Sequence, residues 1–162
     1  MIRKLILPVC IAILLSGNTF AQNAGSLKKI APFKITLNTG SAFSADKLAQ
    51  GPVILIYFSP DCEHCQDFTK DMLKNYSVVG KKQVVMVTPQ SMEMIRPFVS
   101  KFNLSAYPNI KIGTEGSTRL VQKYYNVMQY PFIALYDKTG KLVKSFEGEQ
   151  PHIDIFNAMK TL

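Results

Sequence analysis

The stretch that decides the fold is Val53-Ile54-Leu55-Ile56-Tyr57-Phe58-Ser59-Pro60-Asp61-Cys62-Glu63-His64-Cys65. Its first six residues are all apolar rather than alternating, which predicts a central strand buried on both faces. Two cysteines separated by two residues follow this strand. A disulfide that closes so small a ring removes little chain entropy from the unfolded state, about 2 kcal/mol, so the pair predicts a reversible dithiol rather than a structural crosslink.

A helix that starts after the buried strand would make the first cysteine of this pair more reactive. A helix is expected to begin near Cys62, with Asp61 as its N-terminal cap, and to run past Leu73. Unpaired backbone amides and the positive end of the helix dipole favour a thiolate there, and the thiolate is the reactive form of cysteine. Cys65 lies one turn later on the same face. We therefore expect Cys62 to be the exposed attacking thiol and Cys65 to be the thiol that resolves the mixed disulfide.

His64 is a further candidate catalytic residue because it lies between the two cysteines. A positive charge on its imidazole would favour the Cys62 thiolate, while the Glu63 carboxylate would oppose this effect. The other histidine, His152, follows Pro151 at the expected start of the last helix, where a capping or surface role is favoured over catalysis. Only His64 is therefore assigned to the site.

The amino terminus has the pattern of a secretory signal peptide. Two basic residues, Arg3 and Lys4, precede an apolar stretch at residues 5–15, and a polar segment follows that ends at Ala21. The apolar stretch is too short to cross a bilayer, which takes about 20 residues. We expect residues 1–21 to be removed and the protein to be exported, to the periplasm or the cell exterior, with no membrane span left. Lipid anchoring through Cys10 is disfavoured because the bulky Val9 precedes it.

Cleavage would leave one domain of about 140 residues, which is a common domain size. A polar lead-in at residues 22–29 would precede this domain, at residues 30–162. The net charge of the whole chain is +8, and it falls to +6 without Arg3 and Lys4, since residues 1–21 contain no acid. The basic residues are spread along the chain, so a solvated basic surface is expected and nucleic-acid binding is not.

Strands and helices alternate along the sequence, which predicts an α/β fold. The residues between 84 and 87 form a second buried strand, expected to pair in parallel with residues 53–58 through a right-handed crossover. Ile153, Phe156 and Met159 have helical spacing and are expected to cover the sheet. Further strands are expected at residues 33–37, 109–112, 132–136 and 142–146, and further helices at residues 44–49, 91–102, 119–125 and 153–162.

These segments resemble the thioredoxin-like fold, and within it the exported TlpA-like redoxins. The resemblance rests on the strand and cysteine motif, on its continuation to Val87, on Tyr130-Pro131-Phe132-Ile133-Ala134-Leu135-Tyr136-Asp137, and on the hairpin at Gly140. It implies a mixed central sheet flanked by helices, with a small insertion at residues 103–116 before the proline segment. It also implies that Pro131 is cis and faces the cysteine pair.

The resemblance implies an exported thiol-disulfide oxidoreductase without an organic cofactor or metal. Cys62 and Cys65 would exchange disulfides with partner proteins, and an upstream redox partner would reset the pair. Pro131 would shape a groove for the backbone of the partner. Tyr130, Pro60 and Asp61 are the other residues expected in this groove.

The sequence departs from this family at three positions. Ile56 stands six residues before the first cysteine, where thioredoxins commonly have a buried aspartate, and Phe68 stands where some exported reductases carry an acid. Asp61 replaces the tryptophan that is frequent just before the motif. No internal base is therefore visible at residue 56 or residue 68. Peroxiredoxin chemistry is disfavoured because Leu55 stands where that family requires proline, although Ser59 fits its pattern.

Metal binding is the alternative from a different class. A structural zinc site needs four ligands, and the mature chain offers only His64 and His152 beyond the two cysteines. Copper(I) prefers soft sulfur ligands, and Met92 and Met94 add two thioethers. The alternative is therefore a copper(I)-handling binding module without turnover, although methionines at helix positions more often fill a core.

Overall fold

The structure is a computed structural model that describes residues 29–162. The expected signal peptide, residues 1–21, and the lead-in up to residue 28 lie outside the described residues. No helix between residues 29 and 162 is long and apolar enough to cross a membrane.

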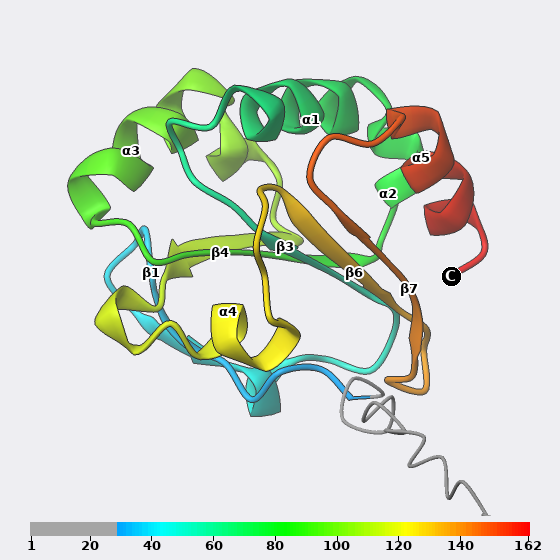
Figure 1. Ribbon diagram of the computed structural model, residues 1–162, viewed down its shortest axis with the longest axis horizontal. Coiled ribbons are helices and arrows are strands. Elements are labelled where there is room, and N and C mark those ends of the chain that lie inside the picture. Colours follow the sequence, from blue (N-terminus) through cyan, green and yellow to red (C-terminus); the bar gives the residue numbers. More distant parts are fainter. Residues whose placement is uncertain (1–28) are drawn as a thin grey trace, which may run out of the picture.

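A seven-stranded mixed sheet forms the centre of the molecule (Figure 1). Its strands lie in the order β2-β1-β5-β4-β3-β6-β7. Strands β3, β4 and β5 run parallel, and the other four are added to them through antiparallel pairs. In chain order the strands are β1 (Lys34–Leu37), β2 (Ala42–Ser44), β3 (Val53–Tyr57), β4 (Gln83–Thr88), β5 (Ile110–Thr114), β6 (Phe132–Tyr136) and β7 (Leu142–Glu147). The expected mixed sheet is confirmed.

Helices cover both faces of this sheet (Figure 1). Helices α1, α2, α3 and α5 lie against one face, and α4 lies against the other. The helices are α1 (Glu63–Lys74), α2 (Tyr76–Val79), α3 (Met92–Lys101), α4 (Leu120–Tyr125) and α5 (His152–Lys160), with short 3-10 turns η2 (Ala45–Lys47), η3 (Leu104–Ala106) and η4 (Gly116–Thr118). The expected α/β architecture is therefore present.

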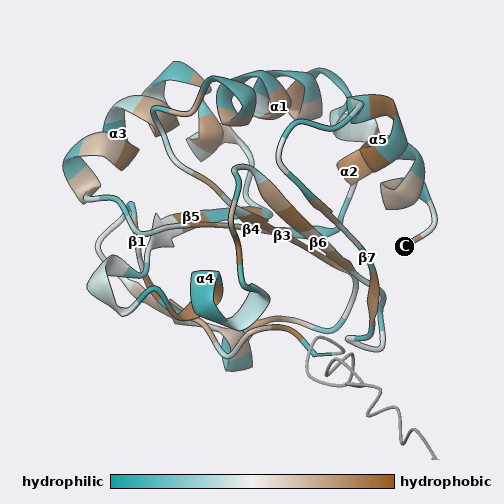
Figure 2. Cartoon of the chain, viewed as in Figure 1, coloured by the Kyte–Doolittle hydropathy of each residue, from teal (hydrophilic) through white to brown (hydrophobic). Residues whose placement is uncertain are grey.

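The central strand β3 is buried at every position, as its apolar sequence predicts. Ile54 and Ile56 enter the core beneath α1, whereas Leu55 and Tyr57 enter the core beside α4. Successive side chains of a strand point to opposite faces, so a strand between two layers is apolar throughout. Figure 2 shows the strands as the hydrophobic centre beneath helices with hydrophilic outer faces. This packing fixes the end of β3, from which the cysteine motif continues.

The segment expected as an insertion, residues 103–116, supplies strand β5. This strand pairs in parallel with β4 and antiparallel with β1. A Cβ atom at Gly113 would lie 2.3 Å from the Thr36 carbonyl oxygen, so only glycine lets β1 approach this closely. The insertion therefore extends the sheet and docks the amino-terminal strands onto it.

The prediction of a short helix at residues 44–49 is wrong in its length. The segment forms a single 3-10 turn, and Ser44 makes no side-chain hydrogen bond that caps it. The nearby Ser44 side chain lowers the pKa of the exposed Asp46 carboxyl group.

The buried face of the last helix also differs from the prediction. The helix begins at His152, and the side chain of Ile153 is 60% exposed. The buried apolar residues are Ile155, Phe156 and Met159. The stripe that covers the sheet therefore begins two residues later than expected, although its spacing is helical.

Candidate active site

Cys62 is the N-terminal cap of α1, and its sulfur accepts a hydrogen bond from the Cys65 N–H at 3.3 Å. The prediction that Asp61 caps this helix is wrong, because the Asp61 carboxylate instead accepts a hydrogen bond from the Ser59 hydroxyl. The backbone of Cys62 is extended, so its sulfur occupies the position usually taken by a capping oxygen. The free amides and the positive end of the α1 dipole therefore act directly on this sulfur.

The two cysteines differ in exposure. Cys62 is half-buried, whereas Cys65 is only 1% exposed and belongs to the core beneath α1. Burial, with a smaller contribution from Cys62, raises the pKa of the Cys65 thiol. Near neutral pH the inner sulfur is therefore held as a thiol, and only the outer sulfur meets solvent. This asymmetry fits an attacking Cys62 and a resolving Cys65.

The turn between β3 and α1 is braced from two helices. The Gln66 side-chain amide donates a hydrogen bond to the Pro60 carbonyl oxygen at 2.7 Å. The Lys101 ammonium group donates in turn to the Gln66 side-chain oxygen at 2.6 Å. Pro60 is buried and Asp61 is exposed, and both line a cavity of about 270 Å³ together with Met94. Of the groove residues expected here, Asp61 is therefore the one open to a partner.

The peptide bond between Tyr130 and Pro131 is cis, as the resemblance implied. Pro131 is buried, and Tyr130 is half-buried with its ring centroid 5.7 Å from that of Tyr57. The Glu147 carboxylate holds the preceding loop, since it accepts hydrogen bonds from the backbone N–H groups of Met128 and Gln129 at 2.5 and 2.9 Å. The end of β7 therefore fixes the wall that Pro131 provides.

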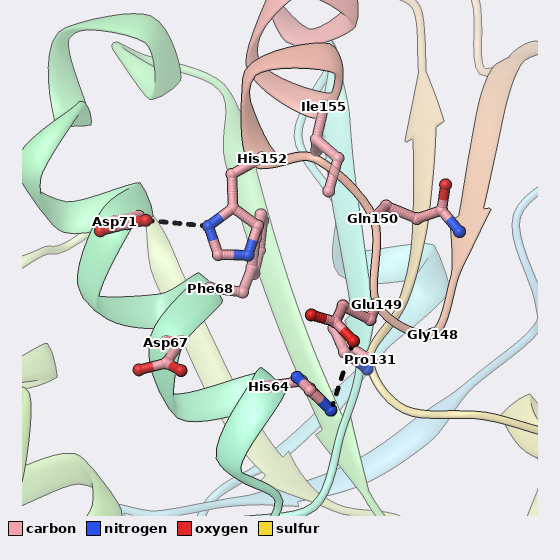
Figure 3. A pocket seen from close by; sticks show the side chains of 10 residues that line it. All are labelled: His64, Asp67, Phe68, Asp71, Pro131, Gly148, Glu149, Gln150, His152 and Ile155. Carbon is pink, nitrogen blue, oxygen red and sulfur yellow. Dashed lines mark hydrogen bonds and ion pairs between the residues drawn. The ribbon is translucent and has the colours of Figure 1, made fainter.

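His64 lies at the edge of a second cavity, of about 400 Å³, which Pro131 also lines (Figure 3). The His64 Nε2 atom is 3.9 Å from a Glu149 carboxylate oxygen, and both side chains are more than half exposed. Deeper in, the His152 Nδ1 atom is 2.9 Å from an Asp71 carboxylate oxygen. This hydrogen bond lowers the pKa of Asp71. The cavity therefore adjoins the cysteine motif and carries both histidines.

With this geometry in place, residues 41–162 match the family described as Thioredoxin-like domain. The chain belongs to the thioredoxin-like family. Among curated proteins, it is 26% identical over 119 residues to Protein disulfide isomerase-like 1-2 from Oryza sativa subsp. japonica. That match covers 71% of this chain but only 23% of the relative, so the chain spans about a quarter of the relative's length.

Solved structures of similar fold include redox proteins from two bacteria. A secreted Mycobacterium tuberculosis disulfide oxidoreductase, homologous to E. coli DsbE, superposes with a TM-score of 0.69 at 18% identity, covering 86% of this chain and 99% of that one. A thiol-disulfide oxidoreductase from Bacteroides fragilis gives 0.66 at 15% identity, covering 83% and 100%. At these identities the likeness establishes the thioredoxin-like fold.

Two features of this thioredoxin-like site have no signal in the sequence. The first is the hydrogen bond between Asp71 and His152, which are 81 residues apart. The second is Glu115, a buried acid whose Oε2 atom accepts a hydrogen bond from the Val121 N–H at 2.7 Å. Its other oxygen lies near the Tyr57 hydroxyl without an ordinary hydrogen bond, and burial, together with this carboxylate, raises the pKa of Tyr57. Glu115 therefore lies next to Tyr57, whose ring in turn contacts that of Tyr130.

Proposed function

We propose that this protein is an exported thiol-disulfide oxidoreductase that reduces or exchanges disulfides of partner proteins. The observation that carries the proposal is the pairing of a half-buried Cys62 sulfur at the start of α1 with a fully buried Cys65 one turn later. The redox activities named for the rice, mycobacterial and Bacteroides relatives support it. The signal-peptide pattern of residues 1–21 supports export to the periplasm or the cell exterior.

The reaction needs only the two sulfurs. The Cys62 thiolate attacks one sulfur of a partner disulfide, forms a mixed disulfide and releases the other partner sulfur as a thiolate. Cys65 then gives up its proton and attacks the Cys62 sulfur, which releases the second partner thiol and leaves a Cys62–Cys65 disulfide. Two electrons have passed to the partner. An upstream dithiol then donates two electrons to the Cys62–Cys65 disulfide and restores the two thiols. The same steps in reverse oxidise a partner, and neither direction requires an organic cofactor or a metal.

The groove residues position the partner for this attack. Pro131 lines the cavity beside His64, with Tyr130 before it in the cis peptide bond, and Asp61 and the buried Pro60 line the cavity at the turn before α1. A partner backbone laid along Pro131 brings its disulfide to the exposed sulfur of Cys62. Substrate recognition is therefore assigned to these four residues.

The first prediction is catalytic turnover. The purified protein, supplied with dithiothreitol, should accelerate the reduction of insulin well above the rate with dithiothreitol alone. A copper(I) chelator should leave this rate unchanged, because both transferred electrons reside on sulfur. The turbidity of the released insulin B chain reports the rate.

A copper(I)-handling module remains the competing function, since Met94 lines the cavity beside Asp61. Met92, by contrast, packs against the core beneath α1 and α3. In the part of the chain that the structure describes, no three His, Cys, Asp or Glu side chains are grouped to hold a metal ion. Failure to reduce insulin, together with one-to-one copper(I) uptake that resists the chelator, would replace the proposed function with this one.

The second prediction concerns His64. A charged imidazole stabilises the Cys62 thiolate and with it the reduced protein, so His64→Gln should make the reduction potential of the pair more negative. A tenfold change in thiolate stability corresponds to about 30 mV for a two-electron couple, so the shift should be tens of millivolts. Equilibration with glutathione measures the potential, and an unchanged potential in His64→Gln would remove His64 from the site.

A further inference from the structure

The cavity beside His64 has a shape and composition that disulfide exchange alone does not explain (Figure 3). It lies between α1 and the segment that joins β7 to α5, and its volume is about 400 Å³. Its lining includes the buried side chains of Phe68 and Ile155, which are 1% and 2% exposed. Pro131 belongs both to this lining and to the wall of the redox groove. The cavity is therefore an extension of that groove, and six of its ten lining residues are polar or charged.

The charges around this cavity are opposite in sign to those of the protein as a whole. The chain contains 19 Lys and Arg residues against 11 Asp and Glu, yet none of the ten lining residues is a lysine or an arginine. Three of them are acids, Asp67, Asp71 and Glu149. The Asp71 carboxylate is bonded to His152 and lies 3.5 Å from the Lys74 ammonium group. Asp67 forms no ion pair within residues 29–162, and Glu149 has only the distant contact with His64.

We propose that this cavity is a subsite for a lysine or arginine side chain of the partner, near the partner cysteine that Cys62 attacks. The proposal rests on the proposed function, since it assigns a substrate class to the same groove. A long basic side chain keeps its charged end near acids and water. Asp67 and Glu149 supply exposed carboxylates, and Glu149 also lies 3.9 Å from His64. Asp67 and Glu149 are therefore specificity-determining residues.

The same arrangement works against acidic partners. A glutamate in the cavity would meet three carboxylates of like charge, those of Asp67, Asp71 and Glu149. Discrimination of this kind comes as much from repulsion of the wrong partner as from attraction of the right one. The surface of the protein, which is basic elsewhere, would not by itself favour basic partners.

The third prediction tests this subsite with synthetic peptides. Each peptide carries one cysteine as a mixed disulfide with 5-thio-2-nitrobenzoate and one variable residue, which is arginine, glutamine or glutamate. The variable residue is moved through the positions on both sides of the cysteine. Attack of Cys62 on the peptide sulfur breaks the S–S bond and releases the coloured thiolate, because that thiol is the better leaving group. Its release by the reduced protein gives the rate for each peptide.

At the best position the arginine peptide should react about fivefold faster than the glutamine peptide, with the glutamate peptide slowest, which is the range expected for exposed ion pairs. The preference should shrink in high salt. The double variant Asp67→Asn, Glu149→Gln should lose it. Asp154→Asn removes an exposed acid of α5 that does not line the cavity, and it should keep the preference.

The outcomes separate the subsite from the proposed function. Equal rates for the three peptides at every position, with efficient release of the chromophore, would overturn the subsite and leave the oxidoreductase standing. A preference for arginine that the double variant retains would also overturn it, since the charge would then act from elsewhere. Absence of release from every peptide would instead contradict the proposed function.

Discussion

Replacing Cys65 by serine is expected to turn the protein into a trap for its partners. Cys62 keeps its place at the start of α1 and still attacks, but serine cannot displace the partner from the mixed disulfide. Covalent complexes should therefore accumulate, and insulin turnover should fall to the background rate. Non-reducing electrophoresis of cell fractions, followed by mass spectrometry of the bands, measures this accumulation and identifies the partners.

The matched variant Cys62→Ser should trap few partners or none. It leaves Cys65, which is 1% exposed and whose thiol pKa is raised by burial. A raised pKa means that little thiolate exists at neutral pH, so alkylation of this thiol should be slow there. The alkylation rate should rise only at a pH above the pKa of an ordinary thiol, which is about 8.5. If Cys62→Ser is the variant that collects disulfide-linked partners, the two roles are reversed.

The parts of the fold that the sequence predicts are those whose signals lie in one continuous segment. The all-apolar run before Cys62 predicts the buried strand β3, and a parallel partner strand, β4, lies beside it. The apolar residues after Pro131 predict strand β6, whereas the cis peptide bond before it was implied only by the family resemblance. Each of these strands is predicted by the apolar residues that form it, so contacts with distant residues did not alter the outcome.

The capping of α1 shows where such local reasoning fails. Asp61 and Cys62 are adjacent, and aspartate is the better capping residue by preference. The Ser59 hydroxyl is bonded to the Asp61 carboxylate, which leaves the cap to the Cys62 sulfur. Preference scales rank single residues, whereas this outcome depends on a competition between neighbouring side chains.

Long-range contacts around the site were beyond sequence reasoning for a different reason. The Glu147 carboxylate fixes the loop before Tyr130 from 18 residues away, and His152 reaches Asp71 across 81 residues. Neither pair has a characteristic spacing, because strand order and helix placement bring its members together. The acid-lined cavity beside His64 is a product of these same contacts.

Replacing Phe68 by alanine is expected to give the largest loss of stability among these variants. The Phe68 ring is 1% exposed and contacts two residues of α5: its centroid is 6.1 Å from that of Phe156 and 5.4 Å from that of His152. Truncation of a buried phenylalanine costs about 3–5 kcal/mol, because apolar burial is lost and a cavity remains. That is a large share of the roughly 5–15 kcal/mol that stabilises a typical domain. The midpoint of urea unfolding of the reduced protein should fall accordingly.

Phe43→Ala is the matched control, because Phe43 is only half-buried on the edge strand β2 and its ring contacts Phe33 at 5.9 Å. It loses less burial and leaves no enclosed cavity, so its cost should be less than half that of Phe68→Ala. Equal losses in the two variants would show that Phe68 does not join α1 to α5. Phe68→Leu keeps most of the apolar volume, so its loss of stability should be much smaller than that of Phe68→Ala.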